Sequence, residues 1–517
     1  MSGYVPNIPR ATRDAELRNV EPTDHHALQW AQYVQYGQRP SAKPATTEVA
    51  LRIGVFFDGT GNNATNTALG ERCGAHHPIE PEDLDAACKP YMADPDSSYG
   101  NDITNIRKLH DLYPEEAIPT GESSRVRLTR RIYVDGIGTR AGGKDSLLGA
   151  ALGRGDTGVV SRVQEAFDSI ERTLCRLAVD VEGCQFTSVI FDVFGFSRGA
   201  AAARHFVNEV ASSHRSYWRA ILTANKQLFS LTFIDDYKRD VDIGFIGLFD
   251  TVASVGGISN AGNVRSPIAP GVRLHLPAKT FPDVVHLVAR DEWRANFALN
   301  SIAPDHMELV LPGAHSDIGG GYLSETQEHV LVSPMQALTV STRTNIKATS
   351  IYQDAVLDRA KMIAKGWPAS MLEVVTPEPI HLPIDPQDRL APAQKRVFAA
   401  VRLKRPVRGE LSRLYLRLMH KLAAARNVPF MAVPESGEYL IPADLSRICA
   451  SFMDGTYSLT GADEKLLRER YIHFSGHWSH PFGKSTSGGV KLLYINSPTA
   501  DLHRVVHPHV PDRSLIL

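Results

Sequence analysis

The sequence predicts an α/β protein built on an open, mostly parallel sheet with helices on both faces. Between residues 51 and about 325, apolar strand-forming runs alternate with segments of helical periodicity, the pattern of parallel strands joined by helices. Polar or glycine-rich residues directly follow several of these runs. Because the carboxyl ends of parallel strands meet at one edge of a sheet, we expect a functional site along that edge.

The first strand is expected over residues 51–57. The loop after it, residues 58–63, reads Asp-Gly-Thr-Gly-Asn-Asn, which suits positive backbone dihedral angles and presents amide N–H groups. Residues 68–100 are rich in Pro, His, Asp and Glu and are expected to be an insertion rather than core. A second strand is expected over residues 131–134. A helix over residues 157–178, with apolar residues at helical spacing, leads into the next strand.

That next strand, residues 189–194, is followed by Gly195-Phe196-Ser197-Arg198-Gly199 and an alanine-rich helix. A serine between two glycines at a strand-to-helix turn is the layout of a nucleophile elbow, which lifts the hydroxyl clear of the sheet. Glycine tolerates the strained backbone and close contacts on either side of such a turn. The motif therefore predicts a nucleophilic serine on an α/β-hydrolase-like sheet.

Three more strands are expected after the serine, each ending in residues capable of chemistry. A serine hydroxyl is a poor nucleophile, so it needs a histidine to take its proton and an acid to orient that histidine. Ser197, Asp250 and His315 follow one another in the Ser, Asp, His chain order of α/β hydrolases. Asp291 is the alternative acid. The strands cover residues 245–249, 284–289 and 307–311.

An oxyanion formed at this serine needs two preorganised N–H donors. The backbone amide of Arg198 is one expected donor, and the loop at Gly59 and Thr60 is the expected source of the other. A simple tight turn over residues 58–63 is the alternative interpretation of that loop. Asp317 is expected to brace the loop of His315 rather than to act on substrate.

Three regions are expected along the chain: a polar N-terminal arm over 1–45, the catalytic core over 46–330, and a mostly helical appended region over 331–517. Residues 389–426 contain eleven Lys and Arg residues and one Glu. Leucines at helical spacing within this segment, from Leu411 to Leu422, suit either an interfacial membrane- or partner-binding helix or a core-packed helix with a basic outer face.

Composition excludes several classes of protein. The formal net charge of −1 gives no global attraction to nucleic acid. We expect synthesis in the cytoplasm, because the first residues lack the apolar segment of a signal peptide and no later run is long enough to span a membrane. The five cysteines do not form a zinc motif, and a Cys73–Cys88 bridge after export stays open. His473, His477 and His480 are spaced like metal ligands, but without a carboxylate partner nearby no metal site is assigned.

Six blocks taken together resemble the first family of type VI secretion lipase effectors, which are antibacterial phospholipases with an α/β-hydrolase catalytic domain. The resemblance implies phospholipase A activity without a cofactor, a triad of Ser197, Asp250 and His315, and Asp250 rather than Asp291 as the acid. It also implies export through the type VI apparatus on a separate spike protein, action on membrane phospholipid in the periplasm of a target cell, and a periplasmic immunity protein in the producer. The blocks are residues 55–62, 135–139, 195–199, 248–252, 291–294 and 312–321.

Two other function classes stay open at this point. One is a metal-dependent hydrolase that uses Asp58, Asp135 and the C-terminal histidines. The other is a catalytically inactive hydrolase scaffold that serves as a binding module.

Overall fold

The computed structural model describes most of the chain from residue 46 onwards. The unit that starts at Thr47 is compact, and the arm expected over residues 1–45 lies outside the described residues. The described ranges are 46–80, 82–118, 124–145, 158–212, 216–253, 271–383, 392–479 and 496–512.

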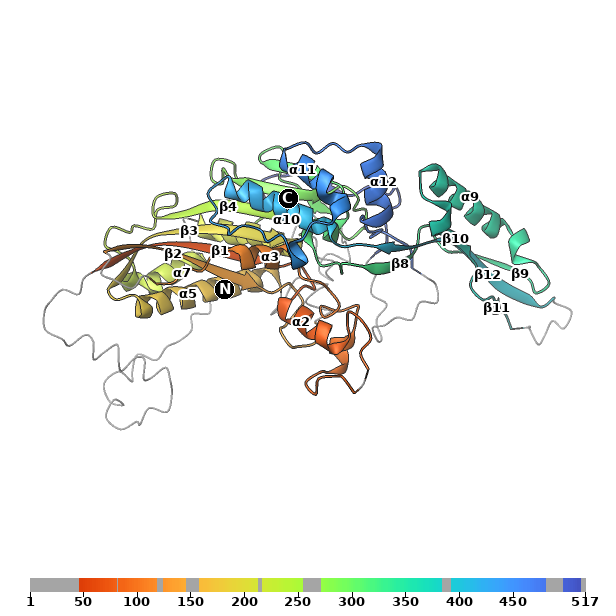
Figure 1. The fold of residues 1–517 in the computed structure, drawn as a ribbon, viewed down its shortest axis with the longest axis horizontal. Coiled ribbons are helices and arrows are strands. Elements are labelled where there is room, and N and C mark those ends of the chain that lie inside the picture. Colours follow the sequence, from red (N-terminus) through yellow and green to blue (C-terminus); the bar gives the residue numbers. More distant parts are fainter. Residues whose placement is uncertain are drawn as a thin grey trace. The chain divides into compact units, whose positions relative to one another are not determined.

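A six-stranded sheet in the order β2-β1-β3-β4-β5-β7 forms the centre of the fold (Figure 1). Every neighbouring pair is parallel, as the alternation of strand and helix patterns predicts. The expected α/β class is therefore confirmed. The strands are β1 (Thr47–Phe57), β2 (Arg125–Val134), β3 (Cys184–Phe196), β4 (Val241–Phe249), β5 (Val284–Ala289) and β7 (Met307–Leu311).

Helices cover both faces of this sheet (Figure 1). Successive side chains of a strand point to opposite faces, so Ile53, Val55 and Phe57 of β1 join one apolar core while Phe56 joins the other. The first core is closed by α5 (Val159–Asp180), α6 (Arg198–Val210) and α7 (Tyr217–Ala224). The second is closed by α3 (Asn105–Leu112), α8 (His315–Gly319), α10 (Leu411–Ala424), α11 (Ser446–Met453) and α12 (Gly461–Arg470).

Helix α10 settles the two interpretations of the basic segment. Leu411, Leu414 and Leu418 are buried in the second core, so the core-packed interpretation is correct and the interfacial helix is wrong. Arg417, one of the basic residues of this helix, forms an ion pair with Glu435 instead of joining the core. The boundary expected at residue 330 is also wrong, because residues beyond it supply one of the layers that cover the catalytic sheet.

The expectation of a mostly helical region over residues 331–517 is wrong for its first part, up to residue 407. Five strands centred on β12 form an antiparallel sheet there, packed against α9 (Ser350–Ala364). Val397, Ala399, Val401 and Leu403 of β12 contribute to this apolar core at every second position. Phe398 and Ala400 between them are also buried, and the Lys and Arg residues on both sides of this run hide the strand. The strands are β8 (Thr326–Leu331), β9 (Gln336–Ser341), β10 (Leu372–Val375), β11 (Ile380–His381) and β12 (Gln394–Val407).

The remaining elements are short. Strand β6 (Leu299–Asn300) pairs in parallel with β13 (Val506–His507), which joins the C-terminal segment to the main unit. No helix among the described residues has both the length and the apolar character needed to cross a membrane. The 3-10 turns are η1 (Pro90–Ala93), η2 (Lys226–Leu228), η4 (Ile346–Ala348), η5 (Ala369–Met371), η6 (Gly437–Tyr439) and η7 (Ala443–Leu445).

The insertion expected after β1 folds around its own small apolar cluster. It contains α2 (Ala64–Cys73) and η1, and a disulfide joins Cys73 to Cys88. Asn101, the residue directly after the insertion, contacts the loop that follows β1, because its Nδ2 donates to the carbonyl oxygen of Gly61 at 2.8 Å. The bridge that the sequence leaves open therefore forms within the insertion that precedes this contact.

Replacing Cys73 and Cys88 by serine should lower the free energy of unfolding by about 3 kcal/mol, because a bridge across 15 residues restricts the unfolded chain. Urea denaturation of the oxidised protein and the double variant measures the difference. Cys175→Ser, which removes an exposed free thiol, is the control and should change stability by less than about 0.5 kcal/mol. Equal midpoints for the double variant and the native chain would contradict the expected role of the bridge.

Candidate active site

Ser197 occupies a strained turn between β3 and α6. Its φ of 58° and ψ of −123° lie outside the regions that L-residues ordinarily occupy. The glycines on either side are required by packing: a Cβ at Gly195 would collide with the backbone of Gly199 and Ala200, and a Cβ at Gly199 with the carbonyl oxygens of Phe57 and Asp58. The structure therefore forms the sharp elbow that the sequence predicts.

The elbow is hydrogen-bonded to the end of the neighbouring strand. The Ser197 amide donates to the carbonyl oxygen of Phe249 at 3.0 Å, and the Val252 amide donates to the carbonyl oxygen of Ser197 at 3.3 Å. Asp250 lies between these two partners, so the parallel pairing of β3 and β4 places the serine beside the candidate acid. The Ser197 side chain is 5% exposed.

Asp250 and His315 are joined directly. Nδ1 of His315 donates to Oδ2 of Asp250 at 2.5 Å, which leaves Nε2 as the proton-accepting nitrogen of the neutral ring. The ring lies between those of Phe196 and Phe297, with centroids 4.7 and 4.9 Å away. Phe196 precedes Ser197 in the elbow, so His315 lies against the nucleophile turn. The Ser197 hydroxyl makes no hydrogen bond to His315 in the part of the chain that the structure describes.

Asp250 has a second partner, the positively charged Arg504, that sequence analysis missed. Nη1 and Nη2 of Arg504 donate to Oδ1 and Oδ2 of Asp250 at 2.6 and 2.8 Å. The Ala289 amide adds a bond to Oδ1 at 2.9 Å. Burial alone would raise the pKa of Asp250, but the Arg504 charge and the His315 hydrogen bond outweigh it and hold the pKa well below its usual range. No motif near residue 504 marks this role.

Asp291 does not contact the His315 ring. Its Oδ2 accepts the Gly313 amide at 2.8 Å, and it pairs with Arg290, so it braces the loop before His315. The next residue, Glu292, forms a buried ion pair with Arg294 and accepts a hydrogen bond from the backbone amide of His315 at 3.2 Å. Burial raises the pKa of Glu292, but the Arg294 charge more than offsets it and holds the pKa at about 2.

The pKa of His315 lies below its ordinary value. Burial disfavours the charged ring most strongly, and the Asp250 hydrogen bond and charge offset this only in part. The ring therefore stays neutral at neutral pH. A neutral imidazole with a free Nε2 is the form that can accept a proton from a serine hydroxyl.

Asp317 and His473 form a second pair that fixes the histidine loop. Oδ2 of Asp317 accepts the amides of Ala314 and His473, both at 2.9 Å, and Oδ1 lies 2.7 Å from Nδ1 of His473. The His473 ring stacks on Tyr322. These contacts make Asp317 a loop brace and use one nitrogen of the first histidine that was weighed as a metal ligand; His480 lies outside the described residues.

The two candidate oxyanion donors of the loop after β1 differ in what they contact. The Gly59 amide donates to Oδ1 of Asp58 at 2.7 Å, so it is already engaged. The Thr60 amide makes no hydrogen bond to any described residue, and its buried hydroxyl is also unpartnered. Tyr133 and Thr104 donate to the Asp58 carboxylate at 2.6 and 2.8 Å, and burial raises the pKa of Asp58 to about 6. Of the two loop amides, that of Thr60 is the one available to a ligand.

Comparison with known proteins shows similarity to one family of effectors. Residues 209–340 match the family described as type VI secretion phospholipase effector, Tle1-like, catalytic domain. A solved structure described as the Tle1 effector bound to the VgrG spike of the type 6 secretion system is 28% identical, with a TM-score of 0.67, over 95% of this chain and 98% of that one. The chain is similar to this family over residues 209–340 and to the Tle1 effector structure over almost its whole length.

The resemblance that the six sequence blocks indicate is thereby confirmed at the level of a Tle1-like phospholipase effector. The matched residues include Asp250 and His315 and begin after the Ser197 elbow. A second structure, an uncharacterized protein from Pseudomonas aeruginosa, has a TM-score of 0.28 and 20% identity over 57% of this chain and 44% of that one, too distant to support an argument. A search of curated proteins gave no match.

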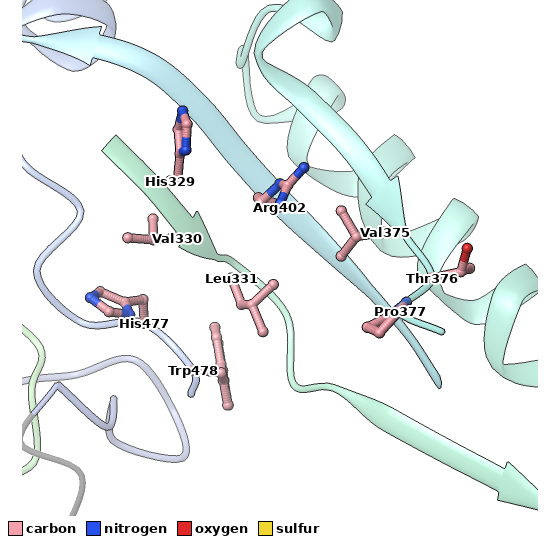
Figure 2. A pocket seen from close by; sticks show the side chains of 9 residues that line it. All are labelled: His329, Val330, Leu331, Val375, Thr376, Pro377, Arg402, His477 and Trp478. Atoms are coloured by element: carbon pink, nitrogen blue, oxygen red, sulfur yellow. The ribbon is translucent and has the colours of Figure 1, made fainter. Parts of the chain in front are cut away.

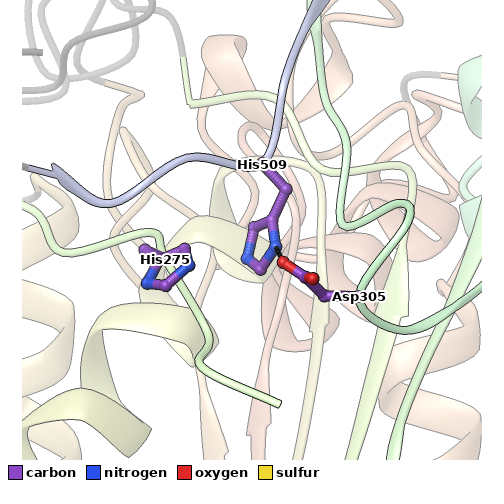
Figure 3. Close-up of side chains that lie close together, drawn as sticks. All are labelled: His275, Asp305 and His509. Carbon is purple, nitrogen blue, oxygen red and sulfur yellow. Dashed lines mark hydrogen bonds and ion pairs between the residues drawn. The ribbon is translucent and has the colours of Figure 1, made fainter. Parts of the chain in front are cut away.

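Two other features of the Tle1-like chain lie outside the Ser197 site. A cavity of about 540 Å³ lies beside β8 and β12, with Arg402 and Trp478 in its lining (Figure 2), and it contains none of Ser197, Asp250 or His315. His275, Asp305 and His509 cluster elsewhere (Figure 3). Both ring nitrogens of His509 are engaged there: Nδ1 lies 2.7 Å from Asp305, and Nε2 accepts the Leu276 amide at 3.0 Å.

Ser197→Gly should make the Tle1-like chain more stable than Ser197→Ala by about 1 kcal/mol. Glycine relieves the strain of a positive φ, worth about 1–3 kcal/mol, and the gain is reduced because glycine is more flexible in the unfolded state. Both variants lack the hydroxyl, so the difference between their denaturation midpoints reports the contribution of the backbone conformation at residue 197 to stability. Equal midpoints would show that the elbow is not strained.

Proposed function

We propose that this Tle1-like chain hydrolyses acyl esters of membrane glycerophospholipids, as a phospholipase A, through a covalent acyl-enzyme. The observation that carries the proposal is the buried Asp250–His315 pair beside the strained Ser197 elbow. The match to the phospholipase effector family supports a lipid substrate.

In the proposed mechanism, Ser197 Oγ attacks the ester carbonyl carbon while Nε2 of His315 takes the hydroxyl proton. Asp250 accepts the Nδ1 hydrogen bond and stabilises the imidazolium. The backbone amides of Arg198 and of the Gly59–Thr60 loop stabilise the oxyanion, with Thr60 as the loop donor that is free to do so. His315 then protonates the leaving alcohol oxygen, and water attacks the acyl-serine with His315 again accepting the proton, which releases the fatty acid and restores Ser197.

This mechanism requires the Ser197 hydroxyl to reach Nε2 of His315. Catalytic hydrogen bonds are often long without substrate and tighten in the complex. The backbone of the elbow is already held against β4. The separation between Ser197 Oγ and Nε2 of His315 is therefore expected to change by rotation of the serine side chain, without movement of the backbone. Filling the site with an ester is therefore expected to complete the triad.

The contacts of Asp58 favour the serine mechanism over the metal-dependent alternative. Both of its carboxylate oxygens accept hydrogen bonds from protein groups, which reduces their availability to a metal ion. In an inactive scaffold, the strained backbone at Ser197 would lower stability without serving any function. In a hydrolase, the same strained turn is needed to present the nucleophile.

We propose the partners and location by the same reasoning. The similar Tle1 effector is described as bound to a VgrG spike, so we expect this chain to be loaded onto a separate spike protein. Delivery to the periplasm of a target cell, where membrane phospholipid is the substrate, and protection of the producer by a periplasmic immunity protein belong to the same proposal.

Ser197→Ala should abolish phospholipid hydrolysis, with a loss of at least about 1,000-fold, because no other group replaces the attacking oxygen. Fatty acid release from phospholipid vesicles, measured by mass spectrometry, gives the rate. A substrate with different acyl chains at its two ester positions also reports which ester is cut. A fluorophosphonate should label Ser197 in the native protein and fail to label the variant.

The control is Ser230→Ala, which changes a serine outside the site and should keep full activity. Hydrolysis by correctly folded Ser197→Ala at the native rate would end the serine mechanism, and loss of native activity with a metal chelator would favour the metal-dependent alternative.

The kcat/KM for a soluble ester should fall on the acid side with an apparent pKa below 6.5. The reaction needs neutral His315, and burial lowers the pKa of that ring, so activity persists at pH 6.5 and is lost as the pH falls through the lowered pKa. A pH profile in buffers of constant ionic strength provides the measurement. An acid limb centred above 7 would mean that the environment of His315 stabilises the imidazolium instead.

A further inference from the structure

We propose that Arg504 is a positioning residue of the Ser197 site, which holds the Asp250 carboxylate in the orientation from which it orients His315. The proposal rests on the proposed serine mechanism. It also means that the C-terminal segment, residues 496–512, completes a site whose other parts lie between residues 58 and 315.

Arg504 compensates the negative charge of the Asp250 carboxylate and also fixes the orientation of its plane. A bidentate guanidinium–carboxylate pair constrains the rotation of the carboxylate, which a single hydrogen bond does not do. Arg504 is itself fixed, because its Nε donates to the carbonyl oxygen of Phe297 at 2.7 Å and its side chain is 8% exposed. All three nitrogens of the guanidinium are therefore used at this site.

The four hydrogen bonds to Asp250 are shared equally by its two oxygens. Oδ1 accepts from the Ala289 amide and Arg504, and Oδ2 accepts from His315 and Arg504. Without Arg504, each oxygen keeps one donor and the buried charge loses its cationic partner. The carboxylate then has freedom to turn away from Nδ1 of His315, which would release the ring from the orientation needed for proton transfer.

The segment that carries Arg504 is fastened on both sides of this residue. Before it, the amide of Thr499 donates to the Trp293 carbonyl oxygen at 2.9 Å. After it, β13 pairs with β6, and the amides of Leu274 and His275 donate to the Asp512 carboxylate. The His509 ring adds its contact with Asp305 (Figure 3) and accepts the Leu276 amide. These contacts fix the backbone on both sides of Arg504, so its side chain is held in place beside Asp250.

Arg504 also acts on the titration of His315 through Asp250. The hydrogen bond and the charge of Asp250 raise the pKa of His315, so a carboxylate that turns away after loss of Arg504 should lower this pKa and move the acid limb of the rate profile to lower pH. The other charged or titratable groups near the ring keep their side chains in this variant. They are Asp250, Glu292, Arg294, Asp317, Tyr322 and His473.

The experiment compares Arg504→Gln and Arg504→Lys with a matched control, Arg52→Gln. Arg52 forms the same kind of bidentate pair with buried Asp192, at 2.7 and 2.8 Å, in the middle of β1 and β3, where no histidine is attached. Each variant is assayed with para-nitrophenyl butyrate, a soluble ester that removes membrane binding from the measurement. Denaturation midpoints report the fraction of folded protein in each assay.

We expect Arg504→Gln to lower kcat roughly 100-fold while KM stays within about twofold, because misplacing a catalytic group by about 1 Å has an effect of this size. Its acid limb should move to lower pH, because the weakened contact with Asp250 no longer supports the charged ring. Arg504→Lys should lose less, since it keeps the charge without the two-point geometry. Arg52→Gln should lose activity only in proportion to unfolding. An Arg504→Gln enzyme that behaves like Arg52→Gln, or whose acid limb does not move to lower pH, would overturn the proposal.

A spectroscopic measurement separates this proposal from the proposed function. The Nδ1 proton of His315 in its short bond to Asp250 should give a low-field resonance in protein labelled with ¹⁵N-histidine, lost or shifted in Arg504→Gln and retained in Arg52→Gln. Fluorophosphonate labelling of native Ser197 tests the serine mechanism independently. Absence of labelling would remove the proposed function, whereas an unchanged resonance in Arg504→Gln would remove the role of Arg504.

Discussion

The burial of an ionised carboxylate at Asp250 is the constraint on which the arrangement of this site depends. An unpaired carboxylate in such a position is strongly disfavoured, and the chain compensates with donors from β5, from the loop that begins α8 and from the C-terminal segment. Each donor lies where it does because the backbone around it is fixed by the sheet or by pairing with it. The position of one side chain thus determines how three distant segments must meet.

The parallel sheet provides the other half of this arrangement. Its strand ends bring the Ser197 elbow, Asp250 and the loop of His315 to one edge, and the buried pair of Glu292 and Arg294 supports the His315 backbone from the next strand end. The strained elbow persists because Gly195 and Gly199 pack against backbone that leaves no room for a side chain. Rigid packing therefore maintains a conformation that local propensity disfavours.

The sequence predicts those parts of the fold and the site whose signal is local. The strand before Ser197 and the glycines of the elbow can be found within a dozen residues, and the order of Ser197, Asp250 and His315 follows from strand ends. Arg504 could not be found in this way, since nothing in its neighbours indicates a carboxylate 254 residues earlier in the chain. Strand β12 was missed for a different reason: its buried run from Val397 to Val401 is flanked on both sides by Lys and Arg residues that resemble a solvated surface.

The long separation of Asp250 and Arg504 in the sequence adds only modestly to the entropic cost of bringing them into contact. The entropy of closing a loop grows only logarithmically, so that doubling its length costs about 0.6 kcal/mol, and pairing of β13 with β6 shares this cost with other contacts. The larger consequence is kinetic, because contacts of high sequence separation form late and slow folding. A site closed by residue 504 is therefore assembled only when the C-terminal segment has docked, which couples the orientation of His315 to the completed fold rather than to the central sheet alone.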